Sequence, residues 1–164
     1  MKKIFILVIS ITMCISVKAQ KFGYIDSQEL LLLMPERKNA ETEVQEFAKS
    51  LESQLAAMTS EYQQSVENYQ TNESTYTELV KQDKIAEITS LEQRIQSFQQ
   101  NAQQALQNKE KELLEPILQK ARDAIQEVAK EGNYTYIFDK SMGPLLYVSE
   151  SENIISEVRK KLGL

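Results

Sequence analysis

The sequence lacks the side chains on which most enzymes depend. It has no histidine, so the commonest general base and metal ligand is missing. Its only cysteine, Cys14, lies in an apolar stretch near the N-terminus, and its four glycines are too scattered to form a loop that cradles phosphate. These absences argue against catalysis and against nucleotide-driven work, and we expect neither a cofactor nor a metal site.

The first 19 residues have the pattern of a secretory signal peptide. Lys2 and Lys3 precede an apolar stretch over residues 4–17, and Val17 and Ala19 supply small residues for cleavage. The stretch has about 14 residues, whereas a membrane-spanning helix needs about 20. We therefore expect a cleaved signal over 1–19 and an exported mature chain without a thiol. An uncleaved anchor is the alternative.

Acidic residues outnumber basic ones, 24 against 19. Loss of the signal removes three lysines and no acid, so the net charge of the mature chain is about −8. An acidic chain does not attract nucleic acid or anionic lipid by charge alone. We expect no nucleic-acid partner and no strong binding to lipopolysaccharide or to an anionic membrane.

The centre of the chain has helical periodicity. Residues 36–131 contain no glycine and one proline, Pro116, and they are rich in good helix formers. Apolar residues of the first half follow an 11-residue repeat, which is close to the period of a straight helix: Val44, Phe47, Leu51, Leu55, Met58, Tyr62, Val66 and Tyr69. A second apolar series runs over 85–128, after a polar stretch at 71–77. We predict a helical hairpin over 36–131 with its tip in 71–83 and a kink at Pro116. One continuous helix is the alternative.

The segments on either side predict a small β-rich part. Residues 21–26 alternate apolar and polar, and Tyr134–Phe138 is rich in strand formers. Residues 142–144 give a turn signal, so we predict that Leu145–Val148 is a strand that pairs with Tyr134–Phe138.

Two further segments complete this part. Leu30–Met34 is interpreted as an apolar link. A final helix is predicted over Glu152–Leu162, with Ser149 or Ser151 as its cap.

So few strands bury only a small core and are marginal in water by themselves. The shortfall predicts that several copies share one sheet or barrel. We expect residues 20–35 and 132–164 to form an oligomerisation body, to which these residues belong: Phe22, Tyr24, Ile25, Tyr134, Tyr136, Ile137, Phe138, Leu145, Leu146, Tyr147 and Val148.

The outer half of the helical region has an unusual composition. No basic residue lies between Lys49 and Lys81, and tyrosines recur every seven residues at 62, 69 and 76. Tyrosine combines an apolar ring with a polar hydroxyl, so it suits a surface that is exposed to water when free and covered when a partner binds. One interpretation is a soft surface that binds client proteins; the other is that these residues only pack one helix on the other. The candidate client-binding residues are Met58, Tyr62, Val66, Tyr69, Tyr76, Leu79, Ile85 and Ile88.

Four pieces of the sequence, in their order and spacing, are similar to one known family. They are Phe22–Asp26, the long Gln-rich charged region, Leu114–Ile117, and Tyr134–Asp139 after a glycine. The sequence thus resembles the Skp/OmpH family of periplasmic chaperones. The resemblance implies a mainly α fold with a small β body, in a jellyfish-like homotrimer whose three helical hairpins enclose a cavity. It also implies an ATP-independent periplasmic holdase for unfolded outer-membrane β-barrel proteins.

The sequence departs from the family in two ways. Asn153 and Ile155 stand where the family often has Asp and Thr. Well-known members are strongly basic, whereas residues 36–131 hold 11 basic and 18 acidic residues. No lipopolysaccharide or membrane site is therefore carried over, and we expect client binding to depend on apolar and aromatic contacts more than on charge.

Two other functions compete with the holdase. An exported coiled-coil scaffold of the cell envelope would bind no client and would end in a specific docking patch. An enzyme with paired carboxylates would need two acids held together in an apolar pocket, and no segment of the sequence supplies one.

Overall fold

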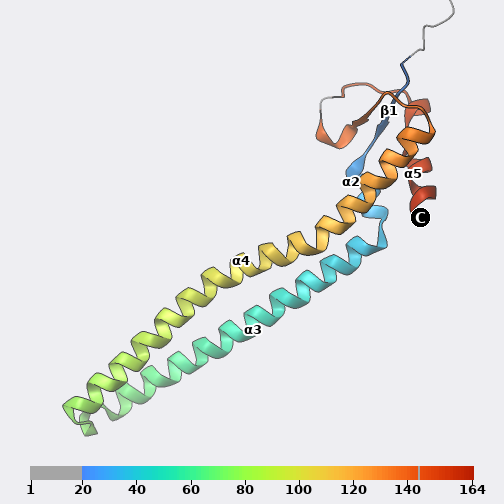
Figure 1. The fold of residues 1–164 in the computed structure, drawn as a ribbon. Coiled ribbons are helices and arrows are strands. Elements are labelled where there is room, and N and C mark those ends of the chain that lie inside the picture. The colour runs from blue at the N-terminus through green and yellow to red at the C-terminus, as the bar shows by residue number, and fades with distance from the viewer. Residues whose placement is uncertain (1–19, 144) are drawn as a thin grey trace, which may run out of the picture. The chain divides into compact units, whose positions relative to one another are not determined.

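The computed structural model describes residues 20–143 and 145–164, so the predicted signal peptide lies outside it. As Figure 1 shows, the described chain is mainly helical with one small sheet, which confirms the predicted mainly α fold with a small β part; the trimer stays a prediction. It divides into two units, residues 20–33 with Ala121–Leu164, here called the body, and Met34–Lys120, here called the helical pair. The elements in chain order are β1 (Phe22–Ile25), α2 (Ser27–Leu33), α3 (Pro35–Asn72), the 3₁₀ helix η1 (Glu73–Thr75), α4 (Glu78–Glu131), β2 (Tyr136–Asp139), the 3₁₀ helices η2 (Lys140–Met142) and η3 (Glu150–Glu152), and α5 (Ile155–Leu162).

The sheet of the body joins the first described segment to a segment that follows both long helices. β1 and β2 pair in parallel, with Phe22 opposite Tyr136 and Ile25 opposite Asp139. On the other side of β1, the Ile154 amide donates to the Tyr24 carbonyl oxygen at 3.0 Å. β1 lies within the predicted strand 21–26, and β2 overlaps the predicted strand Tyr134–Phe138 but extends to Asp139.

The predicted strand Leu145–Val148 is wrong, because this segment pairs with no strand of the described chain. β2 pairs with β1 instead of with the segment that follows it. Gly143, at φ +86°, caps η2 and does not close a hairpin. Leu146 and Tyr147 consequently keep 99% and 88% of their surface in water.

Two other predictions for the body need correction. Leu30–Met34 is not a link, because α2 covers Ser27–Leu33. The Asp26 carboxylate accepts a hydrogen bond from the Glu29 amide at 3.0 Å, which caps this short helix and lets Leu30 point inward, fully buried.

The last helix, α5, begins at Ile155 and not at Glu152, and neither predicted serine caps it. The Asn153 side chain accepts from the Ile155 amide at 3.0 Å, while the hydroxyls of Ser149 and Ser151 bond each other. Residues 150–152 form the separate 3₁₀ helix η3, so the chain reaches α5 through a tight turn.

The core of the body is small. One fully buried side chain comes from α2, and the others come from β1 and the C-terminal segment, with small residues of α4 beneath them. The buried apolar residues are Tyr24, Ile25, Leu30, Ala121, Ala124, Val128, Ile154 and Val158.

The helical pair consists of α3 and the part of α4 up to Lys120, which lie side by side (Figure 1). Ion pairs join them, from Lys109 to Glu43 at 3.8 Å and from Lys120 to Glu36. The alternative of one continuous helix is wrong, because α3 ends at Asn72 and η1 follows. Helix α4 runs through Pro116 without interruption, and the kink there stays a prediction.

Candidate binding surfaces

The candidate client-binding residues lie along the helical pair and none is fully buried. Six of them are partly covered by neighbouring side chains: Met58, Tyr62, Val66, Tyr69, Tyr76 and Ile88. Leu79 and Ile85 are more open, with 69% and 50% of their surface exposed. Two helices can cover only the sides that face each other, so the row of apolar side chains named above remains partly exposed to solvent. Their role in binding remains a prediction.

The end of the helical pair at η1, residues 68–85, is here called the distal end. The rings of Tyr69 and Tyr76 lie 6.3 Å apart between centroids and are tilted by 39°. The Tyr69 hydroxyl donates to Glu73 and the Tyr76 hydroxyl to the Asn68 side chain, each at 3.4 Å. The two rings are therefore held by their polar tips, while part of each ring remains in water.

Carboxylates surround this ring pair. Partial desolvation raises the pKa of the Tyr69 hydroxyl, and the negative charges of Glu73 and Glu78 raise it further. Lys84 is a basic residue near Tyr76, and it is ion-paired with Glu87 at 2.7 Å. Sequence reasoning identified the tyrosines but missed this pairing of rings with carboxylates, which depends on where η1 reverses the chain.

A second surface lies on the sheet of the body. Phe22, Tyr136 and Phe138 share one side of the two strands, as their register requires. Their ring centroids lie 6.0 to 6.4 Å apart, and all three side chains are exposed. These three residues are here called the aromatic face.

The other predicted body residues have mixed environments. Tyr24 and Ile25 are buried, whereas Tyr134, Ile137, Leu145 and Val148 are partly covered. The buried Tyr24 hydroxyl has no hydrogen-bond partner among the described residues. A buried hydroxyl without a partner typically lowers the free energy of unfolding by about 1–3 kcal/mol. As a single chain, the body therefore leaves one buried hydrogen-bonding group unpaired.

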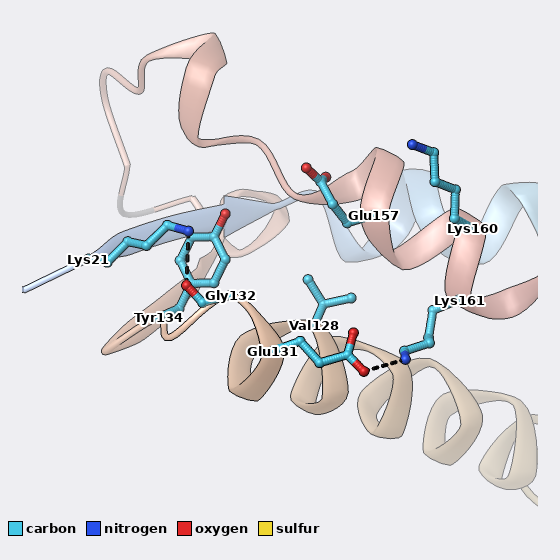
Figure 2. Close-up of a pocket in the computed structure, with 8 residues that line it drawn as sticks. All are labelled: Lys21, Val128, Glu131, Gly132, Tyr134, Glu157, Lys160 and Lys161. Atoms are coloured by element: carbon cyan, nitrogen blue, oxygen red, sulfur yellow. Dashed lines mark hydrogen bonds and ion pairs between the residues drawn. The ribbon is translucent and has the colours of Figure 1, made fainter.

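Figure 2 shows a depression of the body where α4 ends, lined by residues of both charges. Lys21 donates to the Gly132 carbonyl oxygen at 2.9 Å, and its ammonium lies 3.9 Å from the centroid of the Tyr134 ring. Lys161 pairs with Glu131 at 2.6 Å and Glu127 at 3.3 Å. A Cβ on Gly132 would lie 2.4 Å from a ring atom of Tyr134, so only glycine fits beneath the ring. Lys21 and Lys161 thus help to hold β1 and α5 on the end of α4.

Asp139 forms a polar cluster that sequence reasoning missed. Its carboxylate accepts hydrogen bonds from the backbone amides and the hydroxyls of both Ser27 and Ser141, at 2.5 to 3.2 Å. Partial burial would raise the pKa of this carboxyl, but the four hydrogen bonds outweigh it and hold the pKa below its ordinary value. The Asp-x-Ser spacing was the only sequence signal for it.

Chemical sites of other kinds do not emerge within residues 20–143 and 145–164. No three carboxylates or other metal-binding side chains gather there closely enough to hold an ion. None of the described helices has an apolar run long enough to cross a membrane. Exposed apolar side chains that could meet another molecule lie on the helical pair and on the aromatic face, among other places.

Comparison with known proteins places this fold. No curated protein matches the sequence. Among solved structures, that of an OmpH-like protein from Caulobacter crescentus CB15, proposed to be an outer membrane chaperone, has a TM-score of 0.77 at 12% identity. The match covers 90% of this chain and 86% of that one, and at this identity it shows the fold alone. Residues 21–162 match the family described as outer membrane protein (OmpH-like), and the chain therefore belongs to that family.

Proposed function

We propose that this protein is an ATP-independent periplasmic holdase that binds unfolded outer-membrane β-barrel proteins and prevents their aggregation. Membership of the OmpH-like family supports the proposal. The observation that carries it is the row of partly wet apolar and aromatic side chains along α3 and α4. Such a row can cover apolar segments of many sequences without a shaped pocket.

Binding by this row needs more than one copy of the chain. A single helical pair offers one narrow surface, whereas three pairs arranged around an axis would enclose a cavity. We therefore place the client between the helical pairs of a homotrimer, in the jellyfish-like arrangement that the family resemblance implies. The row would line the inside of that cavity.

The body is the part that would hold the trimer together. The exposed aromatic face, the open edge of β2 and the unpaired segment 145–148 are surfaces that a second copy can cover. A contact there would bury large apolar side chains, at roughly 25 cal/mol per Å² of apolar surface, and could give the Tyr24 hydroxyl a partner.

Location follows from the predicted signal peptide over 1–19. The clients would meet the protein after export, in the compartment between the two membranes. No nucleotide is available to drive release there, so client release would have to follow from the client's own folding.

Native mass spectrometry of the mature chain tests this proposal directly. We expect a trimer that gains the mass of one client when a urea-unfolded outer-membrane barrel protein is diluted into it, with the client kept soluble. Bovine serum albumin at equal mass concentration controls for non-specific protection. A stable oligomer that gains no mass while the client aggregates would instead favour the scaffold function.

A further inference from the structure

The distal end carries exposed apolar surface that nothing in the described chain covers. Leu79 and Ile85 are exposed by 69% and 50%, and Val80 between them is also exposed. These residues belong to the first turns of α4, directly after η1. At 3.6 residues per turn, Leu79 and Val80 lie on adjoining sides of α4 and Ile85 lies on another, so Leu79 and Val80 are the exposed apolar side chains beside η1 that a partner can cover.

Negative charge surrounds this surface. Residues 67–87 hold five acidic and two basic residues, and no basic residue lies at positions 50–80. Of the two bases, Lys84 is already bound by Glu87 at 2.7 Å. The distal end thus presents a negative potential, which favours a partner that carries positive charge.

The side chains present are those that bind a cation at short range. Tyrosine ring faces attract ammonium and guanidinium groups, and carboxylates form charge-assisted hydrogen bonds with them. Here two partly exposed rings lie 6.3 Å apart, and one carboxylate lies within 3.4 Å of a ring hydroxyl.

We propose that the distal end selects unfolded polypeptide segments in which arginine or lysine stands beside apolar residues. The ring faces of Tyr69 and Tyr76, with the carboxylates of Glu73 and Glu78, receive the cation. Leu79 and its neighbours receive the apolar side chain. This inference rests on the proposed holdase function and names the class of segment that the helical pair prefers.

The selection adds to the binding along the row and does not replace it. Apolar contact along α3 and α4 supplies most of the affinity for any unfolded client. The distal end contributes the difference between a cationic segment and a neutral one of the same apolar content. Salt should therefore reduce this difference more than the affinity itself.

Three fluorescent, disordered peptides with identical apolar residues test the inference. They carry arginine, glutamine or glutamate at the same positions, and their binding to the mature protein is measured by anisotropy at low and high salt. We expect the arginine peptide to bind about five-fold more tightly than the glutamine peptide at low salt, and the glutamate peptide to bind more weakly than either.

Two double variants separate a local effect from general charge. Glu73→Gln with Glu78→Gln should abolish the preference for the arginine peptide and leave the glutamine peptide unchanged. Glu52→Gln with Glu61→Gln removes the same charge from exposed positions of α3 outside the distal end and should keep the preference. Tyr69→Leu with Tyr76→Leu retains apolar surface, and it should also reduce the preference.

The outcomes are distinguishable from those of the holdase test. Equal binding of the three peptides, or equal loss of preference in both glutamate variants, would overturn the inference while client protection stands. The same holds if unfolded barrel proteins are held but none of the peptides binds. If neither peptide nor client binds, both this inference and the proposed function fail.

Discussion

At the scale of single residues, Asp139 ties separate segments of the body together. Its carboxylate bonds Ser27 at the start of α2 and Ser141 in η2, and it stands opposite Ile25 at the end of the sheet. Four hydrogen bonds to one ionised group fix the directions in which the chain leaves both strands.

This arrangement predicts how the stability of the body depends on pH. The pKa of Asp139 is lowered from an ordinary value near 3.8, so its contribution is present above about pH 4 and is lost as pH falls through the folded-state pKa. Asp139→Asn should cost about 1 kcal/mol at pH 7, a modest figure because the group is only partly buried. It should cost less near pH 3.

Urea unfolding followed by circular dichroism, at a fixed protein concentration, checks this prediction. Glu150→Gln removes an exposed acid of the body and serves as the control. An Asp139→Asn variant whose loss of stability is the same at pH 7 and pH 3 would show that the ionised carboxylate is not responsible.

At the scale of elements, the periodic segments were predictable and the pairing of strands was not. The 11-residue repeat in α3 and the lack of glycine in α4 are local signals, each visible within a few helical turns. Sequence alone therefore locates the helices. β2 instead pairs with a strand 114 residues away, as the neighbouring contact of Lys21 with Thr135 shows. Local turn signals carry no information about such a partner, and they favoured the adjacent segment 145–148.

The same segment yields a prediction about assembly. Its sequence is strand-like, and Leu146 and Tyr147 are almost completely exposed, so we expect another copy to cover these two side chains in the proposed trimer. Leu146→Ser with Tyr147→Ser should shift the native mass spectrum from trimer towards monomer at micromolar concentration. The circular dichroism of the helices should change little.

Leu79→Ser provides the matched control, because this leucine is also exposed but belongs to the helical pair. It should leave the trimer intact. A trimer that survives the double serine substitution would place the interface elsewhere in the body, or show that the aromatic face suffices.

At the scale of the whole molecule, acidic charge distinguishes this chain from the basic members of the family it resembles.

The candidate binding residues were predictable as a row because burial follows helical period, but their exposed fractions were not, since these depend on how closely two helices approach. The polar cluster at Asp139 and the carboxylates around Tyr69 were not predicted, because their members come together only once the chain has folded back on itself.

Client binding by such a molecule should tolerate salt. Screening removes only the Coulombic part of an interaction, and most of the affinity proposed here is apolar. Affinity for an unfolded barrel protein of low net charge should change less than about three-fold between 0.05 and 0.5 M sodium chloride, measured by fluorescence titration. Loss of most of the affinity over this range would contradict the apolar mechanism.

The parallel pairing of β1 with β2 also sets the order in which the protein can form. β1 lies near the start of the described chain, whereas its partner strand and Asn153 follow only after both long helices. The two helices can pair while synthesis continues, beginning with residues on either side of η1 that are close in sequence. The sheet, in contrast, can close only after its distant partner residues have been made. Until then β1 is an unpaired strand, so a newly made copy briefly resembles the unfolded molecules that it is proposed to protect.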